Sequence, residues 1–93
     1  MATPTELLGT LEYLADEEFK KFKWFLQQAD VLEGFPAIQR SQLENADRLD
    51  TVDQIIDTYN KNAVEVTILV LKRIKKPNLV QHLLNINSTP KGK

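Results

Sequence analysis

The chain has 93 residues, of which 42% are hydrophobic and 27% are charged, and it carries a formal net charge of −1 with no cysteine. A chain of this length buries one hydrophobic core, and the absence of cysteine excludes disulfide bonds and thiolate metal sites. Because the sequence has no apolar run of about 18 residues and no secretory signal pattern at its start, we expect a cytoplasmic protein.

Acidic and basic residues occupy alternating blocks of the sequence. Residues 1–18 and 41–57 are predominantly acidic, whereas residues 19–40 and 58–93 are predominantly basic. A small folded domain with such blocks presents opposite charges on different faces. That arrangement favours head-to-tail self-association over nucleic-acid binding, which requires one continuous basic surface.

The first two predicted helices lie in the N-terminal third of the chain. One begins at Pro4, with Thr3 as its N-cap and Glu6 in its first turn, a combination typical of helix starts. Its apolar side consists of leucines at helical spacing: Leu7, Leu8, Leu11 and Leu14. The other follows Asp16 and has an acidic first turn, which suits the helix dipole. Its core side is largely aromatic, with Phe19, Phe22, Phe25, Leu26 and Ala29.

The middle of the chain contains a long loop and two further helices. The loop is expected over residues 31–40, which include Gly34 and Pro36, and a short third helix over residues 41–46. The fourth helix is predicted to begin near Thr51, whose spacing to Gln54 fits a capping box, and Asp50 is a further N-cap candidate. Its apolar side comprises Val52, Ile55, Ile56 and Tyr59.

The last two helices complete an all-α fold. The fifth covers residues 63–74 and is apolar almost all round, which is typical of a helix in the middle of a bundle. The sixth begins at Pro77 and Asn78. Its apolar residues are Leu79, Val80, Leu83 and Leu84. Six helix-start signals, each followed by an apolar run, together predict this fold class.

Two helix surfaces are candidates for partner binding. At about 100° per residue from Phe19, Trp24 falls near 140°, among lysines and away from a core side centred near 300°. An exposed tryptophan in a basic patch is a candidate association hot spot; the alternative is that Trp24 packs beneath the following loop. On the fourth helix, counted from Asp50, Asp53 and Asp57 fall near about 300° and 340°, opposite the apolar side.

Three sequence blocks resemble the pyrin domain family. Leu11-Glu12-Tyr13-Leu14 followed by Glu17-Glu18-Phe19-Lys20-Lys21-Phe22-Lys23 is similar to the family's L-E-x-L helix and its E-E-[FL]-K-K-F-K signature. Residues 40–47 resemble the segment around its short third helix, and residues 63–67 with 70–74 resemble its fifth helix. The resemblance extends from residue 5 to residue 85.

This resemblance implies an antiparallel six-helix bundle of the death fold, Greek-key-like, with a short third helix and a long loop before it. The chain looks most like the N-terminal pyrin domain of a NOD-like receptor sensor. The implied function is homotypic: the domain would recruit the pyrin domain of a speck-forming adaptor, of the pyrin plus caspase-recruitment type, and assemble helical filaments in inflammasome signalling and innate immunity. No membrane partner is expected.

The resemblance and the helical spacing together give two expected partner-binding faces, because the acidic first and fourth helices of one family member meet the basic second and third helices of the next. The acidic face consists of Glu6, Glu12, Asp47, Asp50, Asp53 and Asp57. The basic face consists of Lys20, Lys21, Lys23, Trp24 and Arg40. Phe25 stands where some members carry a basic residue, which would make this face weaker or more apolar.

Catalysis finds no support in the sequence. His82 is the only histidine and the three glycines are scattered, so neither a Cys-His pair, nor a multi-histidine metal site, nor a phosphate-binding loop is expected. We therefore expect no catalytic, cofactor-binding or metal-binding residues and no enzymatic activity.

Several alternatives remain at this point. The prodomain of a pyrin-bearing caspase, a speck-forming adaptor and a pyrin-only regulator would share the fold and its interaction chemistry. A nucleic-acid-binding bundle would use a basic cluster of Lys72, Arg73, Lys75 and Lys76, although the acidic blocks would repel phosphates and cations at a helix C-terminus are the simpler interpretation. We expect an excised domain over residues 1–86, with residues 87–93 beginning a flexible linker to a C-terminal region.

Overall fold

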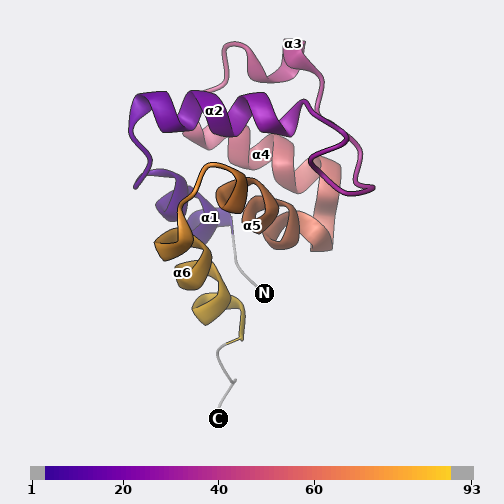
Figure 1. The fold of residues 1–93 in the computed structure, drawn as a ribbon. Helices are drawn as coiled ribbons and strands as arrows, with labels where there is room; N and C mark the ends of the chain where they lie inside the picture. Colours follow the sequence, from indigo (N-terminus) through magenta and orange to yellow (C-terminus); the bar gives the residue numbers. More distant parts are fainter. Residues whose placement is uncertain (1–3, 89–93) are drawn as a thin grey trace.

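The computed structural model describes the backbone of residues 4–88 and the side chains of residues 4–85. Within that range the chain forms six α-helices and one short 3-10 helix, with no strand, so the predicted all-α fold is confirmed (Figure 1). The elements are α1 (Pro4–Leu11), α2 (Asp16–Leu26), α3 (Arg40–Leu43), α4 (Arg48–Tyr59), η1 (Asn60–Asn62), α5 (Ala63–Arg73) and α6 (Pro77–Ser88). None of the described helices is long and apolar enough to cross a membrane.

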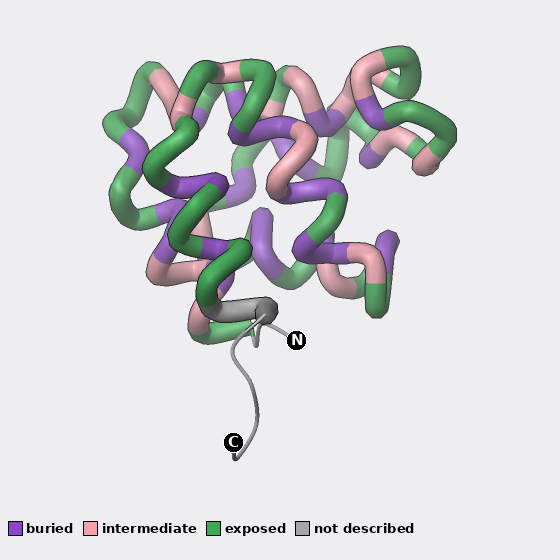
Figure 2. The backbone as a smooth tube through the Cα atoms, turned by 60° about the horizontal axis from the view of Figure 1, so that its bottom comes forward, coloured by how far each residue is buried: buried purple, intermediate pink, exposed green. Residues whose placement is uncertain are grey.

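Helix α5 lies in the middle of the bundle, as its apolar sequence predicts. It packs against α2, α4 and α6, while α1 packs against α4 and α6, and α3 packs on α4. Val66, Val70 and Leu71 of α5 are fully buried. Buried and exposed positions alternate along the helices (Figure 2), because each helix turns one apolar side toward its neighbours.

Helix α2 ends earlier than the apolar spacing suggests. Its buried residues are Phe19, Phe22 and Leu26. Ala29, expected on the same side, is instead exposed in the segment after the helix. The chain leaves the helix at Gln27, whose backbone N–H donates to the carbonyl oxygen of Trp24 at 3.0 Å.

The start of α4 differs from the prediction. Asp47 is the N-cap, and its carboxylate accepts a hydrogen bond from the backbone N–H of Asp50 at 2.8 Å. Asp50 therefore lies in the first turn, and its assignment as N-cap was wrong. Thr51 is buried inside α4. Asp47 satisfies the free N–H group of Asp50, three residues later in the first turn, so the helix begins at Arg48.

The long segment between α2 and α3 is attached to the core. The backbone N–H of Ile38 donates to the carbonyl oxygen of Leu26 at 2.9 Å, and the Ile38 side chain is buried. The hydroxyl of Tyr59 on α4 donates to the carbonyl oxygen of Pro36, and the Tyr59 ring lies edge-on to Phe35 with centroids 6.1 Å apart. Burial raises the pKa of Tyr59 to about 12.

The turn between α5 and α6 has a lysine in a left-handed conformation. Lys75 has a φ of 62°. Its N–H donates to the carbonyl oxygen of Lys72 at 3.2 Å, and the N–H of Lys76 donates to that of Leu71 at 3.0 Å. These are the two hydrogen bonds of a Schellman motif, in which glycine usually occupies the left-handed position.

The two chain ends are only partly described. Helix α6 continues to Ser88, two residues into the segment expected to be a linker. The rest of that segment, residues 89–93, and the proposed N-cap Thr3 lie outside the described residues.

Candidate interaction faces

Helix α4 separates acidic and apolar residues. Asp47, Asp50, Asp53 and Asp57 are all exposed; we call these four residues the α4 acidic face. Val52 and Ile55, on the opposite side, are buried. Leu49, which was not among the predicted partner-binding residues, is 54% exposed. A signal was present, because Leu49 falls near about 260° on the wheel counted from Asp50, between the acidic and apolar sides.

The two glutamates expected on the acidic face lie beside α6. Glu6 and Glu12 line a hollow together with Gly9, Tyr13 and His82, between α1 and α6. The rings of Tyr13 and His82 meet edge-on with centroids 6.1 Å apart. The structure therefore brings these glutamates together beside α6, whereas the aspartates lie along α4.

Trp24 is a surface residue of α2. Its side chain is 54% exposed, and its ring lies edge-on to that of Phe25 with centroids 5.1 Å apart. Lys20 and Lys21 on the same helix are exposed as well. A tryptophan packed beneath the following loop would be buried, so the structure does not show that alternative.

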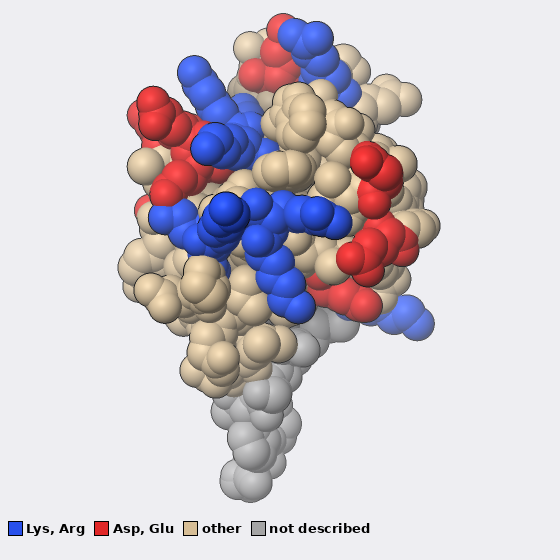
Figure 3. Space-filling model, viewed as in Figure 1, with Lys and Arg blue, Asp and Glu red and all other residues tan. Residues whose placement is uncertain are grey.

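A shallow hollow joins this part of α2 to the turn between α5 and α6. We call it the basic hollow; its lining consists of Lys21, Trp24, Phe25, Arg73, Ile74 and Lys75. Figure 3 shows Lys and Arg side chains gathered over α2 and this turn, on the face of the molecule seen in Figure 1. Sequence reasoning treated the α2 lysines and the cations after α5 as separate clusters, and the packing of α2 on α5 brings them together.

Three residues of the expected basic face do not line the hollow: Lys20, Lys23 and Arg40. The ammonium of half-buried Lys23 donates to the carbonyl oxygen of Ala46 at 2.8 Å and lies 5.0 Å from the centre of the Phe19 ring. It points toward the start of α4 and not outward with Lys20 and Lys21. Arg40 is exposed on α3, where basic atoms are separated from those over α2 by acidic and uncharged surface (Figure 3).

Comparison with known proteins identifies the family. The model described as PAAD/DAPIN/Pyrin domain matches residues 6–81. The chain belongs to the pyrin domain family. The pyrin domain family is a family of protein-interaction modules.

Solved and curated relatives agree with this assignment. The solution structure of the pyrin domain of human Pyrin matches with a TM-score of 0.78 at 33% identity, covering 91% of this chain and 97% of that one. Caspase b of Danio rerio is 36% identical over 89 residues, which are 90% of this chain and 22% of Caspase b. Apoptosis-associated speck-like protein containing a CARD of Mus musculus is 32% identical over 78 residues, covering 83% of this chain and 40% of that protein. The chain thus spans less than half the length of these two curated relatives.

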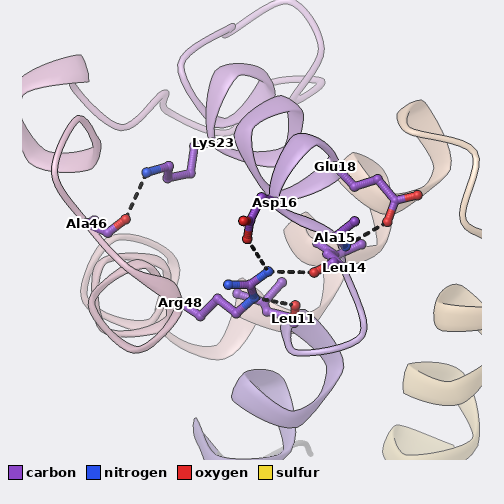
Figure 4. A network of polar contacts seen from close by, with 8 residues as sticks. All are labelled: Leu11, Leu14, Ala15, Asp16, Glu18, Lys23, Ala46 and Arg48. Carbon is purple, nitrogen blue, oxygen red and sulfur yellow. Dashed lines mark hydrogen bonds and ion pairs between the residues drawn. The ribbon is translucent and has the colours of Figure 1, made fainter.

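Arg48 fixes the position of α4 in this pyrin domain (Figure 4). Its Nε donates to the carbonyl oxygen of Leu11 at 3.0 Å, and a terminal guanidinium nitrogen donates to that of Leu14. The guanidinium also lies 3.6 Å from the Asp16 carboxylate and 4.7 Å from the centre of the Phe19 ring. One half-buried side chain therefore joins the start of α4 to the end of α1 and the start of α2, a role that its place in the sequence did not reveal.

Glu18 joins the start of α2 to the start of α6. It forms an ion pair with Lys76, and its Oε1 accepts a hydrogen bond from the backbone N–H of Ala15 at 2.9 Å (Figure 4). The hydrogen bond from Lys76, followed by that from Ala15, lowers the pKa of Glu18 below its ordinary value. One of the four cations of the candidate nucleic-acid cluster is therefore already paired within the pyrin domain.

Proposed function

We propose that this pyrin domain is a homotypic interaction module, in which the α4 acidic face of one copy binds the basic surface of α2 on the next. The observation that carries the proposal is the placement of these charges. Helix α2 lies in front of α4 in Figure 1, and Figure 3 shows basic side chains gathered over α2 on that face. The aspartates of the α4 acidic face and the lysines Lys20 and Lys21 are exposed and form no ion pair with one another among the described residues, so both sets of charges are available to another molecule.

A contact of this kind propagates. It joins two different surfaces, so each bound copy still offers one free face, and a rotation at each step produces a helical filament. Charges at the edge of the contact steer and orient the approaching copy, and apolar groups at its centre slow dissociation. Repetition along a filament makes individually modest contacts sufficient.

We propose the pyrin domain of a speck-forming adaptor as the partner, in cytoplasmic inflammasome signalling of the innate immune response. Support comes from the likeness to a relative whose name records both a speck-like character and a CARD. The contact joins the α4 acidic face of one copy to Lys20, Lys21 and Trp24 of the other. Glu6, Glu12 and Arg40 lie at its margins. Lys23 is left out, because its ammonium bonds to Ala46.

We also propose that the domain works without catalysis. The family is an interaction module, and this chain has no cysteine and one histidine, so its own residues supply neither a thiol nucleophile nor a histidine pair. An interaction module acts by bringing the other domains of its partners together.

The test is negative-stain electron microscopy of the purified domain, alone and with an adaptor pyrin domain, near physiological salt. We expect filaments from the wild type and none from Lys21→Glu or Asp50→Lys, with helical circular dichroism retained in both variants. Lys61→Glu and Glu65→Lys reverse exposed charges outside the two faces and should assemble like the wild type. Equal assembly by all four variants, or a wild type that assembles neither alone nor with the adaptor, would contradict the proposal.

A further inference from the structure

The α4 acidic face surrounds an exposed apolar side chain. Leu49 is one of four large hydrophobic residues exposed among the described residues, at 54%. Asp50 follows it directly, Asp47 precedes it by two positions, and Asp53 lies four residues on, which is the same side of the helix. Leu49 is therefore an apolar projection with carboxylates around it.

The basic hollow has the complementary composition. Trp24, Phe25 and Ile74 supply an apolar surface, and Lys21, Arg73 and Lys75 supply cations around it. Phe25 and Ile74 are half-buried and pack against the core, so the base of the hollow is held by the fold. An apolar centre with a charged margin is the usual composition of a protein–protein contact.

We propose that Leu49 of one copy inserts into the basic hollow of the next, against Trp24, with its flanking aspartates facing Lys21, Arg73 and Lys75. This inference rests on the proposed function and specifies its contact. It extends the basic surface of α2 to the end of α5 and the α5–α6 turn. Trp24 then becomes the hot spot and Leu49 the apolar group that packs against it, because a tryptophan desolvated at the centre of an interface often dominates binding.

The charges favour a second copy over nucleic acid as the occupant. Phosphates would gain from the cations but leave Trp24, Phe25 and Ile74 without an apolar partner, whereas α4 satisfies both parts of the hollow. Lys76 at the edge of this region is already paired with Glu18. Binding to nucleic acid depends on the number of phosphates that free cations neutralise.

The experiment separates the two halves of the contact. Leu49→Arg destroys the projection but keeps the hollow, and Trp24→Glu disrupts the hollow but keeps the projection. We expect each variant alone to be monomeric by size-exclusion chromatography with light scattering. An equimolar mixture should form a one-to-one heterodimer that grows no further, because only one intact pair of surfaces is present.

Two sets of variants control for folding and for exposure. Leu84→Arg changes another exposed leucine, 40% exposed on α6, and should assemble like the wild type. Where a charged substitution lowers the thermal stability seen by circular dichroism, Leu49→Ala and Trp24→Ala serve instead. Each alanine variant should raise the concentration required for assembly about tenfold or more, as loss of a hot spot does.

The outcomes distinguish this inference from the proposed function. Assembly of Leu49→Arg or Leu49→Ala at the wild-type concentration, while Asp50→Lys fails, overturns the role of Leu49 and leaves the charged contact standing. Two monomeric variants that do not pair when mixed also overturn it. Tight binding of a labelled DNA duplex at physiological salt, lost in Trp24→Glu, would assign the hollow to nucleic acid and overturn the inference. A wild type that does not assemble removes the proposed function and this contact together.

Discussion

Arg48, the first residue of α4, donates a hydrogen bond from its Nε to the carbonyl oxygen of Leu11, the last residue of α1, at 3.0 Å. The same guanidinium reaches Leu14 in the turn that follows α1. The helix that carries the acidic face is thus fastened to the N-terminal part of the bundle at its first residue. The position of the face depends on this contact.

Replacing Arg48 should destabilise the fold. Arg48→Met keeps the apolar stem but loses two charge-assisted hydrogen bonds, and we expect a loss of about 2 kcal/mol and a fall in Tm of about 10 °C, measured by circular dichroism. Asp16→Asn is the control, because Asp16 is 95% exposed and lies 3.6 Å from Arg48; such pairs contribute about 0–1 kcal/mol. An equal loss in both variants would show that the ion pair, and not the carbonyl contacts, holds Arg48.

The capping bond of Asp47 and its charge should have separable effects, the first on stability and the second on assembly. Asp47→Ala removes the bond to the N–H of Asp50 and should cost about 1 kcal/mol. Asp47→Asn keeps a capping oxygen but no charge, so we expect near wild-type stability with weakened assembly. Urea denaturation and pelleting of filaments measure the two effects. If Asp47→Asn assembled normally, the charge of Asp47 would lie outside the contact.

Glu18 should make the stability of the fold depend on pH in the acidic range. Its pKa is lowered in the folded protein by Lys76 and Ala15, so the fold favours the ionised form. The resulting stabilisation is complete above the ordinary glutamate pKa of about 4.3 and is lost as the pH falls through the lowered value. Glu18→Gln should therefore be less stable than the wild type at about pH 7, and the difference should shrink at about pH 3. A difference in Tm that stays constant with pH would contradict this.

Tyr59 should affect the alkaline limit of stability. Because burial raises its pKa to about 12, the fold favours the neutral phenol. The stabilisation is complete below the unfolded value of about 10 and is lost as the pH rises toward the folded value. Tyr59→Phe should cost about 1 kcal/mol at neutral pH through the lost bond to Pro36. Its disadvantage should decrease above about pH 10; denaturant titrations of both proteins across this range provide the measurement.

Lys75→Gly should raise stability while weakening assembly. The left-handed φ of 62° at Lys75 is unfavourable for a residue with a side chain, and glycine should gain about 0.5–1 kcal/mol after its own entropy cost. The substitution also removes a cation from the basic hollow. Lys75→Ala is the matched control, since it removes the charge and keeps the unfavourable backbone. A gain in Tm for Lys75→Ala equal to that for Lys75→Gly would refute the backbone explanation.

The sequence was sufficient to predict the order of the helices and the starts of α1, α5 and α6, but not the start of α4. Thr51 and Gln54 have the spacing of a capping box, and Asp50 and Asp47 are also cap-forming residues, so several starts for α4 fit the pattern equally well. The structure selects Asp47. Thr51 then lies inside the helix, and its buried hydroxyl has no hydrogen-bond partner among the described residues. The choice among these cap-forming residues depends on the packing of α4 on α1, through Arg48 and Leu11, as well as on local residue preferences.

The candidate surfaces were predictable only where they belong to one helix. Alternation of aspartates and apolar residues along α4 predicted the acidic face. The basic hollow joins α2 to the turn after α5. The residue spacing within either helix cannot predict a contact between the two. The same limit explains Lys23, whose partner Ala46 lies 23 residues away in the chain. A helical wheel places Lys23 beside Lys20 and Lys21, and only the packed fold shows that its ammonium has turned inward.

The capping bond of Asp47 has one more consequence. A flexible side chain loses rotamer freedom when it is immobilised in an interface, typically at about 0.5–1.5 kcal/mol. The bond to the N–H of Asp50 engages one carboxylate oxygen of Asp47 and already fixes the side chain in the free protein, while the exposed carboxylate keeps its charge for a partner. Most of the rotamer entropy of the Asp47 side chain is therefore lost during folding, before a second copy binds.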